Sequence, residues 1–68
     1  MTTIYKMIEV VGTSPESYAE ATKAAVAEAS KTVRGMRWFE VSGFSGSIQD
    51  GKIEEFQVKL KVGFKVEK

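Results

Sequence analysis

The last third of the chain alternates apolar and polar residues almost without error. From Phe56 to Val66 every second residue is apolar. The residues between them are Gln57, Lys59, Lys61, Gly63 and Lys65. Side chains of a β-strand point to opposite faces with a period of two, so this pattern predicts a strand with one buried face. It favours a central place in a sheet.

Two long strands are expected on either side of Asp50-Gly51, at residues 36–49 and 52–67. The dipeptide is typical of a two-residue type I′ hairpin turn. If these two residues form the whole loop, Trp38 faces Gly63 and Phe39 faces Val62. Gly43 and Gly46 are positions where a bulge could shift this pairing.

The same register continues along the hairpin. It pairs Glu40 with Lys61, Val41 with Leu60, Ser42 with Lys59 and Phe44 with Gln57. Side chains alternate between faces, so Trp38, Phe44 and Gln57 are expected together on one face of the hairpin.

The first half of the chain predicts one strand and one helix. Residues 4–11 are rich in apolar residues on both alternating faces, which suits a strand with contacts on both sides. After a turn at Gly12, Ser14 is expected as the helix N-cap and Pro15 as the first helical residue. The helix should run to about Thr32, with Gly35 as its C-cap. Its six alanines would let it lie close on a sheet.

The element order strand, helix, strand, strand indicates an α+β fold. Its simplest antiparallel sheet places the last strand between the other two, in the order 1-3-2. A single helix covers only one face of this sheet, which leaves Trp38 on the other. Trp38 and Gln57 would lie about 20 Å apart along the ladder, at about 3.3 Å per residue. One small ligand that touches both must therefore bind between subunits.

Composition narrows the classes of function. The 68 residues include no Cys and no His, so disulfides and zinc or haem sites built from these ligands are excluded. One domain over residues 1–68 is expected, and a chain this short is marginal alone, so oligomerisation is the remaining support. The net charge of +1 argues against nucleic-acid binding. No segment approaches the ~20 apolar residues of a membrane span, and we expect a cytoplasmic protein.

Several segments together resemble the dodecin family. They are Val10-Val11-Gly12-Thr13-Ser14, Lys31-Thr32-Val33-Arg34, Arg37-Trp38-Phe39-Glu40-Val41, Phe56-Gln57-Val58 and Val62-Gly63-Phe64. The resemblance covers almost the whole chain. It implies a subunit whose sheet wraps around its helix, twelve of which form a hollow homododecamer.

The resemblance also implies flavins, such as riboflavin, FMN or FAD, bound in pairs between subunits. Trp38 matches the tryptophan that stacks on the ring, and Gln57 matches the residue that hydrogen-bonds its polar edge. Arg37 and Ser45 belong to the same expected site. Many bacterial members have an arginine where this chain has Ser45, so altered flavin selectivity is expected. A second site, for coenzyme A, is implied at positions matched by Lys6, Thr32, Arg34 and Lys65.

These residues support storage of flavin and suppression of its photochemistry, because indole stacks on the flat ring and quenches its excited state. Two other functions remain open. In one, the protein is structural, and Trp38 and Phe44 serve only as contacts between subunits. In the other, the protein buffers coenzyme A or a nucleotide and binds flavin weakly. An enzyme is least favoured, because no nucleophile with an evident base is present.

Overall fold

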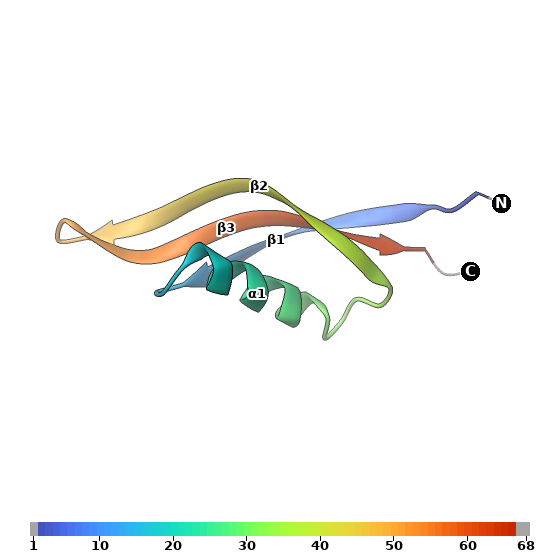
Figure 1. The fold of residues 1–68 in the computed structure, drawn as a ribbon, viewed down its shortest axis with the longest axis horizontal. Helices are drawn as coiled ribbons and strands as arrows, with labels where there is room; N and C mark the ends of the chain where they lie inside the picture. The colour runs from blue at the N-terminus through green and yellow to red at the C-terminus, as the bar shows by residue number, and fades with distance from the viewer. Residues whose placement is uncertain (1, 67–68) are drawn as a thin grey trace.

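The computed structural model describes residues 2–66, which form three strands and one helix (Figure 1). Strand β1 (Tyr5–Ser14) precedes helix α1 (Tyr18–Ala29), and strands β2 (Met36–Gln49) and β3 (Lys52–Lys65) follow as a hairpin. β3 pairs antiparallel with both other strands, in the order β1-β3-β2. The predicted α+β fold and strand order are confirmed.

The hairpin turn is formed as its sequence predicts. Asp50 has φ 53° and Gly51 has φ 75°, and both positive values are those that a type I′ turn requires. Gln49 pairs with Lys52 directly beside the turn. The predicted start and end of β2 are confirmed, whereas β3 ends at Lys65 and the predicted end at Glu67 lies outside the described residues.

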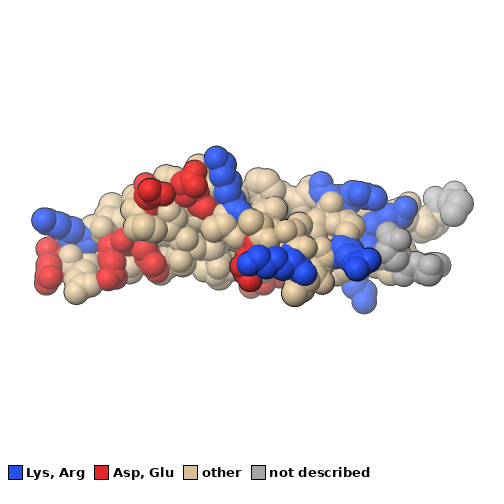
Figure 2. All heavy atoms as spheres, turned by 90° about the horizontal axis from the view of Figure 1, so that it is seen from below, with Lys and Arg blue, Asp and Glu red and all other residues tan. Residues whose placement is uncertain are grey.

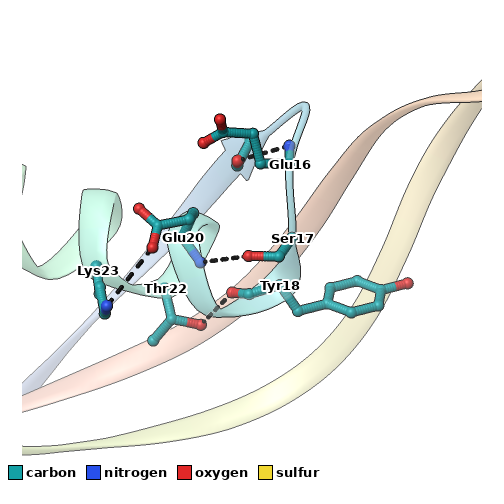
Figure 3. A network of polar contacts seen from close by, with 7 residues as sticks. Glu16, Ser17, Tyr18, Glu20, Thr22 and Lys23 are labelled. Atoms are coloured by element: carbon teal, nitrogen blue, oxygen red, sulfur yellow. Dashed lines mark hydrogen bonds and ion pairs between the residues drawn. The ribbon is translucent and has the colours of Figure 1, made fainter.

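β1 is longer than predicted, because Gly12, Thr13 and Ser14 continue the ladder with β3 and do not form a turn. The predicted N-cap and first helical residue are therefore wrong. Ser14 accepts a hydrogen bond from the Glu16 amide at 3.0 Å, and the helix begins only after Ser17 (Figure 3). The Ser17 hydroxyl accepts from the Glu20 amide at 3.0 Å, so Ser17 is the N-cap.

The helix ends before the predicted residue. Its last residue is Ala29 and its C-cap is Ser30, after which the Thr32 amide still donates to the Ala29 carbonyl in a turn. Gly35 is therefore not the C-cap. It has φ 77° and its carbonyl accepts from the Lys65 amide at 3.0 Å, so it turns the chain into β2 beside the end of β3.

The core lies between α1 and one face of the sheet. Its buried apolar residues are Ala21, Ala25, Ala29, Val58, Leu60 and Val62. Three of the six are alanines, each of which buries little area, so the core of one subunit is small. At Gly12 the helix comes so close that an added Cβ would lie 2.8 Å from the Ala25 Cβ.

Two register shifts in the hairpin change which side chains face the helix. The expected pairs hold from Trp38 to Val41 and again at Ile48 and Gln49. From Gly43 to Ser47 the pairing is offset by one residue, between shifts at Val41/Gly43 and Ser47/Ile48. The expected pairs of Ser42 with Lys59 and of Phe44 with Gln57 are wrong. Phe44 pairs with Val58 and its ring lies 5.1 Å from that of Tyr18, so it belongs to the helix side. Ser45 takes the place opposite Gln57.

The molecule is long and thin, measuring 54 × 20 × 13 Å. The 12-residue helix spans about 18 Å at 1.5 Å per residue, so the hairpin end of the sheet extends well beyond it (Figure 1). The face of the sheet turned away from the helix, here called the open face, includes residues of all three strands. The candidate site lies on this open face.

Candidate functional site

Trp38 lies flat on the open face of the sheet. It pairs in register with Gly63, and a Cβ built on Gly63 would meet three atoms of the six-membered indole ring at nearly equal distances. Equal distances to three ring atoms place the ring face on the glycine. The opposite face of the indole is directed away from the sheet, and the residue is 38% exposed. This face can receive a flat ligand.

Two neighbours hold the indole in place. Its Nε1 donates a hydrogen bond to the Glu40 Oε2 at 3.0 Å, and the indole and the Tyr5 ring pack nearly perpendicular to each other with centroids 5.1 Å apart. Tyr5 lies on β1, so this contact crosses the whole width of the sheet above Gly63. The ring is therefore oriented before any ligand arrives. Tyr5 was not predicted from the sequence, although a lone glycine in the regular pattern of β3 marks a position where another group packs closely.

Gln57 lies in the middle of β3 and is half-buried. The Ser45 hydroxyl donates to Gln57 Oε1 at 3.0 Å, and Gln57 Nε2 donates to Glu55 Oε1 at 3.3 Å. The structure thus brings together Ser45 and Gln57, which the expected register had separated. Glu55 was not predicted, but its place two residues before Gln57 on one strand puts it on the same face.

Trp38 and Gln57 are not brought together within one subunit. Trp38 sits at Gly63, six residues along β3 from Gln57, which corresponds to about 20 Å at 3.3 Å per residue. Between them Lys61 is in register with Glu9 on β1 and with Glu40 on β2. On the open face, the aromatic ring of Trp38 and the amide of Gln57 are therefore separated by charged residues.

Arg37 flanks the indole at the outer edge of β2. It borders a mostly apolar groove of about 200 Å³, whose other lining residues are Val26, Met36, Trp38, Phe39 and Val62. Arg37 is exposed, so its guanidinium is accessible to a charged group beside Trp38.

The four residues matched to a coenzyme A site lie at one end of the molecule but not on one face. Lys65 is in register with Tyr5 and Lys6 with Phe64, so the two lysines point to opposite faces. Thr32 borders a second groove of about 400 Å³ between α1 and β1. Arg34 is exposed in the segment that joins α1 to β2.

Basic side chains gather at this end, and acidic ones gather toward the hairpin (Figure 2). The basic end comprises Lys6, Arg34, Arg37 and Lys65. The acidic end comprises Glu16, Glu20, Asp50, Glu54 and Glu55, with Lys52 as an exception within it. The charges thus nearly cancel over the chain but are separated along its length.

Within residues 2–66 no group of three or more acidic side chains is placed to hold a metal ion. None of the helices found there is long and apolar enough to cross a membrane.

The comparisons with known proteins agree with one another. The family model for dodecin matches residues 4–67. The dodecin of Thermus thermophilus is 47% identical over 64 residues, covering 94% of this chain and 93% of that protein. The dodecin structure from Streptomyces coelicolor superposes with a TM-score of 0.94 at 45% identity, over 97% of this chain and 94% of that one. The calcium dodecin of Mycobacterium tuberculosis is 32% identical over 63 residues, covering 93% of this chain and 89% of that protein. Matched almost from end to end in sequence and in fold, the chain belongs to the dodecin family.

Proposed function

We propose that this chain stores flavin and quenches its photochemistry, as a hollow homododecamer in which flavin pairs stack between subunits. Membership of the family supports a small protein that assembles with itself and binds small ligands. The observation that carries the proposal is the geometry of Trp38, whose ring lies flat on Gly63 with one face directed outward. Two such faces from neighbouring subunits would enclose a pair of stacked rings.

The chemistry of the open face suits a flavin. The isoalloxazine ring is flat and electron-poor, and the electron-rich face of an indole attracts such a ring at stacking distance. Tyr5 and Glu40 already restrict the indole, so ligand binding loses little free energy to ordering this ring. Electron donation from indole to the excited flavin would return it to the ground state without fluorescence.

The separation of Trp38 and Gln57 links binding to assembly. A flavin ring is much shorter than the distance of about 20 Å between the two places, at 3.3 Å per residue. A ring stacked on Trp38 of one subunit would therefore meet Gln57, and Ser45 beside it, from another. The amide of Gln57 both donates and accepts, as the polar edge of the ring requires. Arg37 would lie near a charged group of the flavin side chain.

The decisive experiment is a titration of the purified oligomer with riboflavin, FMN and FAD, followed by flavin fluorescence, with the mass measured in the same sample. We expect saturable quenching by the native chain and none by Trp38→Ala, whose mass should remain that of the oligomer. Trp38→Phe is the matched control, because it keeps an aromatic face and should retain weaker binding. An intact native oligomer that quenches no flavin would overturn the proposal.

A purely structural role predicts a different outcome for the same variant. If Trp38 served only to close contacts between subunits, Trp38→Ala would lower the mass whether or not flavin is present. Catalysis is not part of the proposed function. Detectable flavin-dependent turnover by the oligomer would contradict this part of the proposal.

Coenzyme A is a second candidate ligand, and the basic end favours it. Arg34, Lys6 and Lys65 would attract its phosphates, and Thr32 borders a groove of about 400 Å³. Lys6 and Lys65 point to opposite faces of one subunit, so a shared site would again need residues of neighbouring subunits. Tight binding of coenzyme A by an oligomer that shows no flavin quenching would make this the main function.

A further inference from the structure

We infer that Ser45 and Glu55 fix the orientation of the Gln57 carboxamide, and that this oriented amide makes the site selective for ligands with a carbonyl next to an N–H. Ser45 is then a positioning residue that acts through Gln57. The inference rests on the proposed function, because the ligand is taken to be a flavin. It adds the two residues that orient the amide by which this chain would recognise its ligand.

The two hydrogen bonds of Gln57 use opposite ends of its amide. The Ser45 hydroxyl donates to Oε1 at 3.0 Å, and Nε2 donates to Glu55 Oε1 at 3.3 Å. Ser45 is directly opposite Gln57 on β2, and Glu55 lies two residues before it on β3. Both partners are therefore held by the ladder of the hairpin rather than by a mobile loop.

Glu55 breaks the symmetry that usually leaves an amide free to flip. A hydroxyl can donate or accept, so Ser45 alone would accommodate either end of the carboxamide. An ionised carboxylate only accepts, and a flipped amide would place Gln57 Oε1 against an oxygen of Glu55. With Glu55 holding the NH₂ group, the hydroxyl of Ser45 must donate to Oε1. The three side chains thus specify one orientation.

The groups that remain free define the ligand. An amide NH₂ has two protons and an amide oxygen has two lone pairs. One N–H of Gln57 donates to Glu55, and one lone pair of Oε1 accepts the hydrogen bond from the Ser45 hydroxyl. This leaves one donor and one acceptor side by side on Gln57. Their complement is an adjacent acceptor and donor, which is a carbonyl next to an N–H. The imide edge of a flavin has this arrangement.

The register shift between Ser47 and Ile48 creates this arrangement, because it adds one residue, Glu54, to β3. If the pairing of Ile48 with Ile53 continued without a shift, Phe44 would lie opposite Gln57, and Phe44 can donate no hydrogen bond to the amide. The one-residue shift moves Phe44 to the side of Tyr18 and puts Ser45 in its place. Serine at this position supplies a donor without adding a charge. Selection among ligands should therefore depend on the hydrogen-bonding edge of the ligand and not on its charge.

The binding test compares riboflavin with 3-methylriboflavin, in which the imide N–H is blocked. We expect the native oligomer to bind riboflavin at least tenfold more tightly. In Ser45→Ala the affinity for riboflavin should fall several-fold and the ratio of the two affinities should fall toward one. Ser45→Thr should restore the ratio, because it restores the hydroxyl. Ser47→Ala is the matched control, since Ser47 lies on the same strand but bonds to Glu54.

A second measurement needs no ligand. The chain has two glutamines, Gln49 and Gln57, so selective ¹⁵N labelling gives two side-chain amide signals that can be told apart by substitution. We expect the Gln57 amide to be rigid and the exposed Gln49 amide to be mobile, and Ser45→Ala should mobilise Gln57 alone.

The outcomes separate the inference from the proposed function. A ratio unchanged by Ser45→Ala, or a Gln57 amide as mobile as that of Gln49 in the native oligomer, would overturn the inference while quenching by riboflavin persists. Absence of quenching by every flavin would overturn the proposed function and the selectivity together. The ¹⁵N measurement would then decide whether Ser45 and Glu55 still orient Gln57.

Discussion

Gly63 determines how Trp38 presents its ring. Any side chain on Gly63 would occupy the space that three atoms of the indole now fill. With only a hydrogen there, the ring lies on the backbone, reaches the Tyr5 ring and donates to Glu40. A larger residue would lift the ring and break both contacts. The absence of a side chain at Gly63 therefore sets the orientation of the Trp38 ring.

Gly63→Ala tests this dependence. We expect the indole to tilt and flavin affinity to fall about tenfold, a loss of about 1.4 kcal/mol. Gly43→Ala is the matched control, because a Cβ on Gly43 meets nothing within 4 Å. Affinity is measured by the quenching titration and assembly by mass. Equal affinities of the two variants would show that the orientation of Trp38 does not depend on Gly63.

At the scale of elements, α1 packs closely on β1 at Gly12. An added Cβ on Gly12 would lie 2.8 Å from the Ala25 Cβ and still closer to the Ala21 carbonyl oxygen. The carbonyl belongs to the helix backbone, so relief requires the whole helix to move. The alanines of α1 and Gly12 of β1 therefore form one fitted contact.

Gly12→Ala should destabilise the subunit by about 1–3 kcal/mol, the usual range for overpacking. Urea denaturation monitored by the fluorescence of Trp38 would measure this loss. Gly43→Ala again serves as the control and should change stability much less. A Gly12→Ala variant as stable as the native chain would mean that α1 can shift at little energetic cost.

The start of α1 gives a second test at this scale. Ser17→Ala removes the hydroxyl that accepts from the Glu20 amide and should cost about 1 kcal/mol. Ser17→Asp should retain most of the stability, because a carboxylate also caps a helix. Thermal unfolding of the three chains would show the difference. No loss in Ser17→Ala would contradict the assignment of the N-cap.

The elements were predictable where a local pattern has one solution. Asp50-Gly51 and the alternation after it specify the hairpin, and the strand order follows from it. The helix start was not, because Ser14 and Ser17 are both good N-caps. Ser14 fails only because β1 stays paired with β3 as far as Phe56. Such pairing is a property of the folded sheet and is not visible in the local sequence.

The site was predictable to the same extent. Trp38 opposite Gly63 agrees with the hairpin register, because the two shifts between this pair and the turn cancel by Val41. The contact of Ser45 with Gln57 depends on the shift between Ser47 and Ile48. Gly43 and Gly46 indicated irregularities in this region, and the observed shifts fall beside them, but the sequence did not predict the resulting pairing. Placing an extra residue in a strand depends on how both faces pack. Phe44 packs on Tyr18, and this contact is visible only in three dimensions.

At the scale of the molecule, the subunit leaves much apolar surface uncovered. At the hairpin end Ile48 and Ile53 pair with each other and are 75% and 65% exposed. Val11 on the open face is 60% exposed, and Phe44 on the helix side is 63% exposed. Only six apolar residues are buried in the described chain. Uncovered apolar surface of this extent is typical of a subunit interface.

The isolated subunit should therefore not persist at micromolar concentration. We expect sedimentation to give a mass many times the 7.5 kDa of one chain, and the unfolding temperature to rise with protein concentration. Ile48→Ser combined with Ile53→Ser should shift the distribution to smaller species if the hairpin end is covered on assembly. A native chain that sediments at 7.5 kDa would remove the site between subunits as well.

The separation of the basic end from the acidic end makes each subunit an electric dipole about as long as the molecule, 54 Å. Two copies that approach each other are turned so that unlike ends meet, and this torque favours head-to-tail encounters over random ones. The screening length at physiological ionic strength is about 8 Å, so the torque acts mainly when the ends are already near. Assembly should consequently be slower in concentrated salt, even where the finished shell is equally stable.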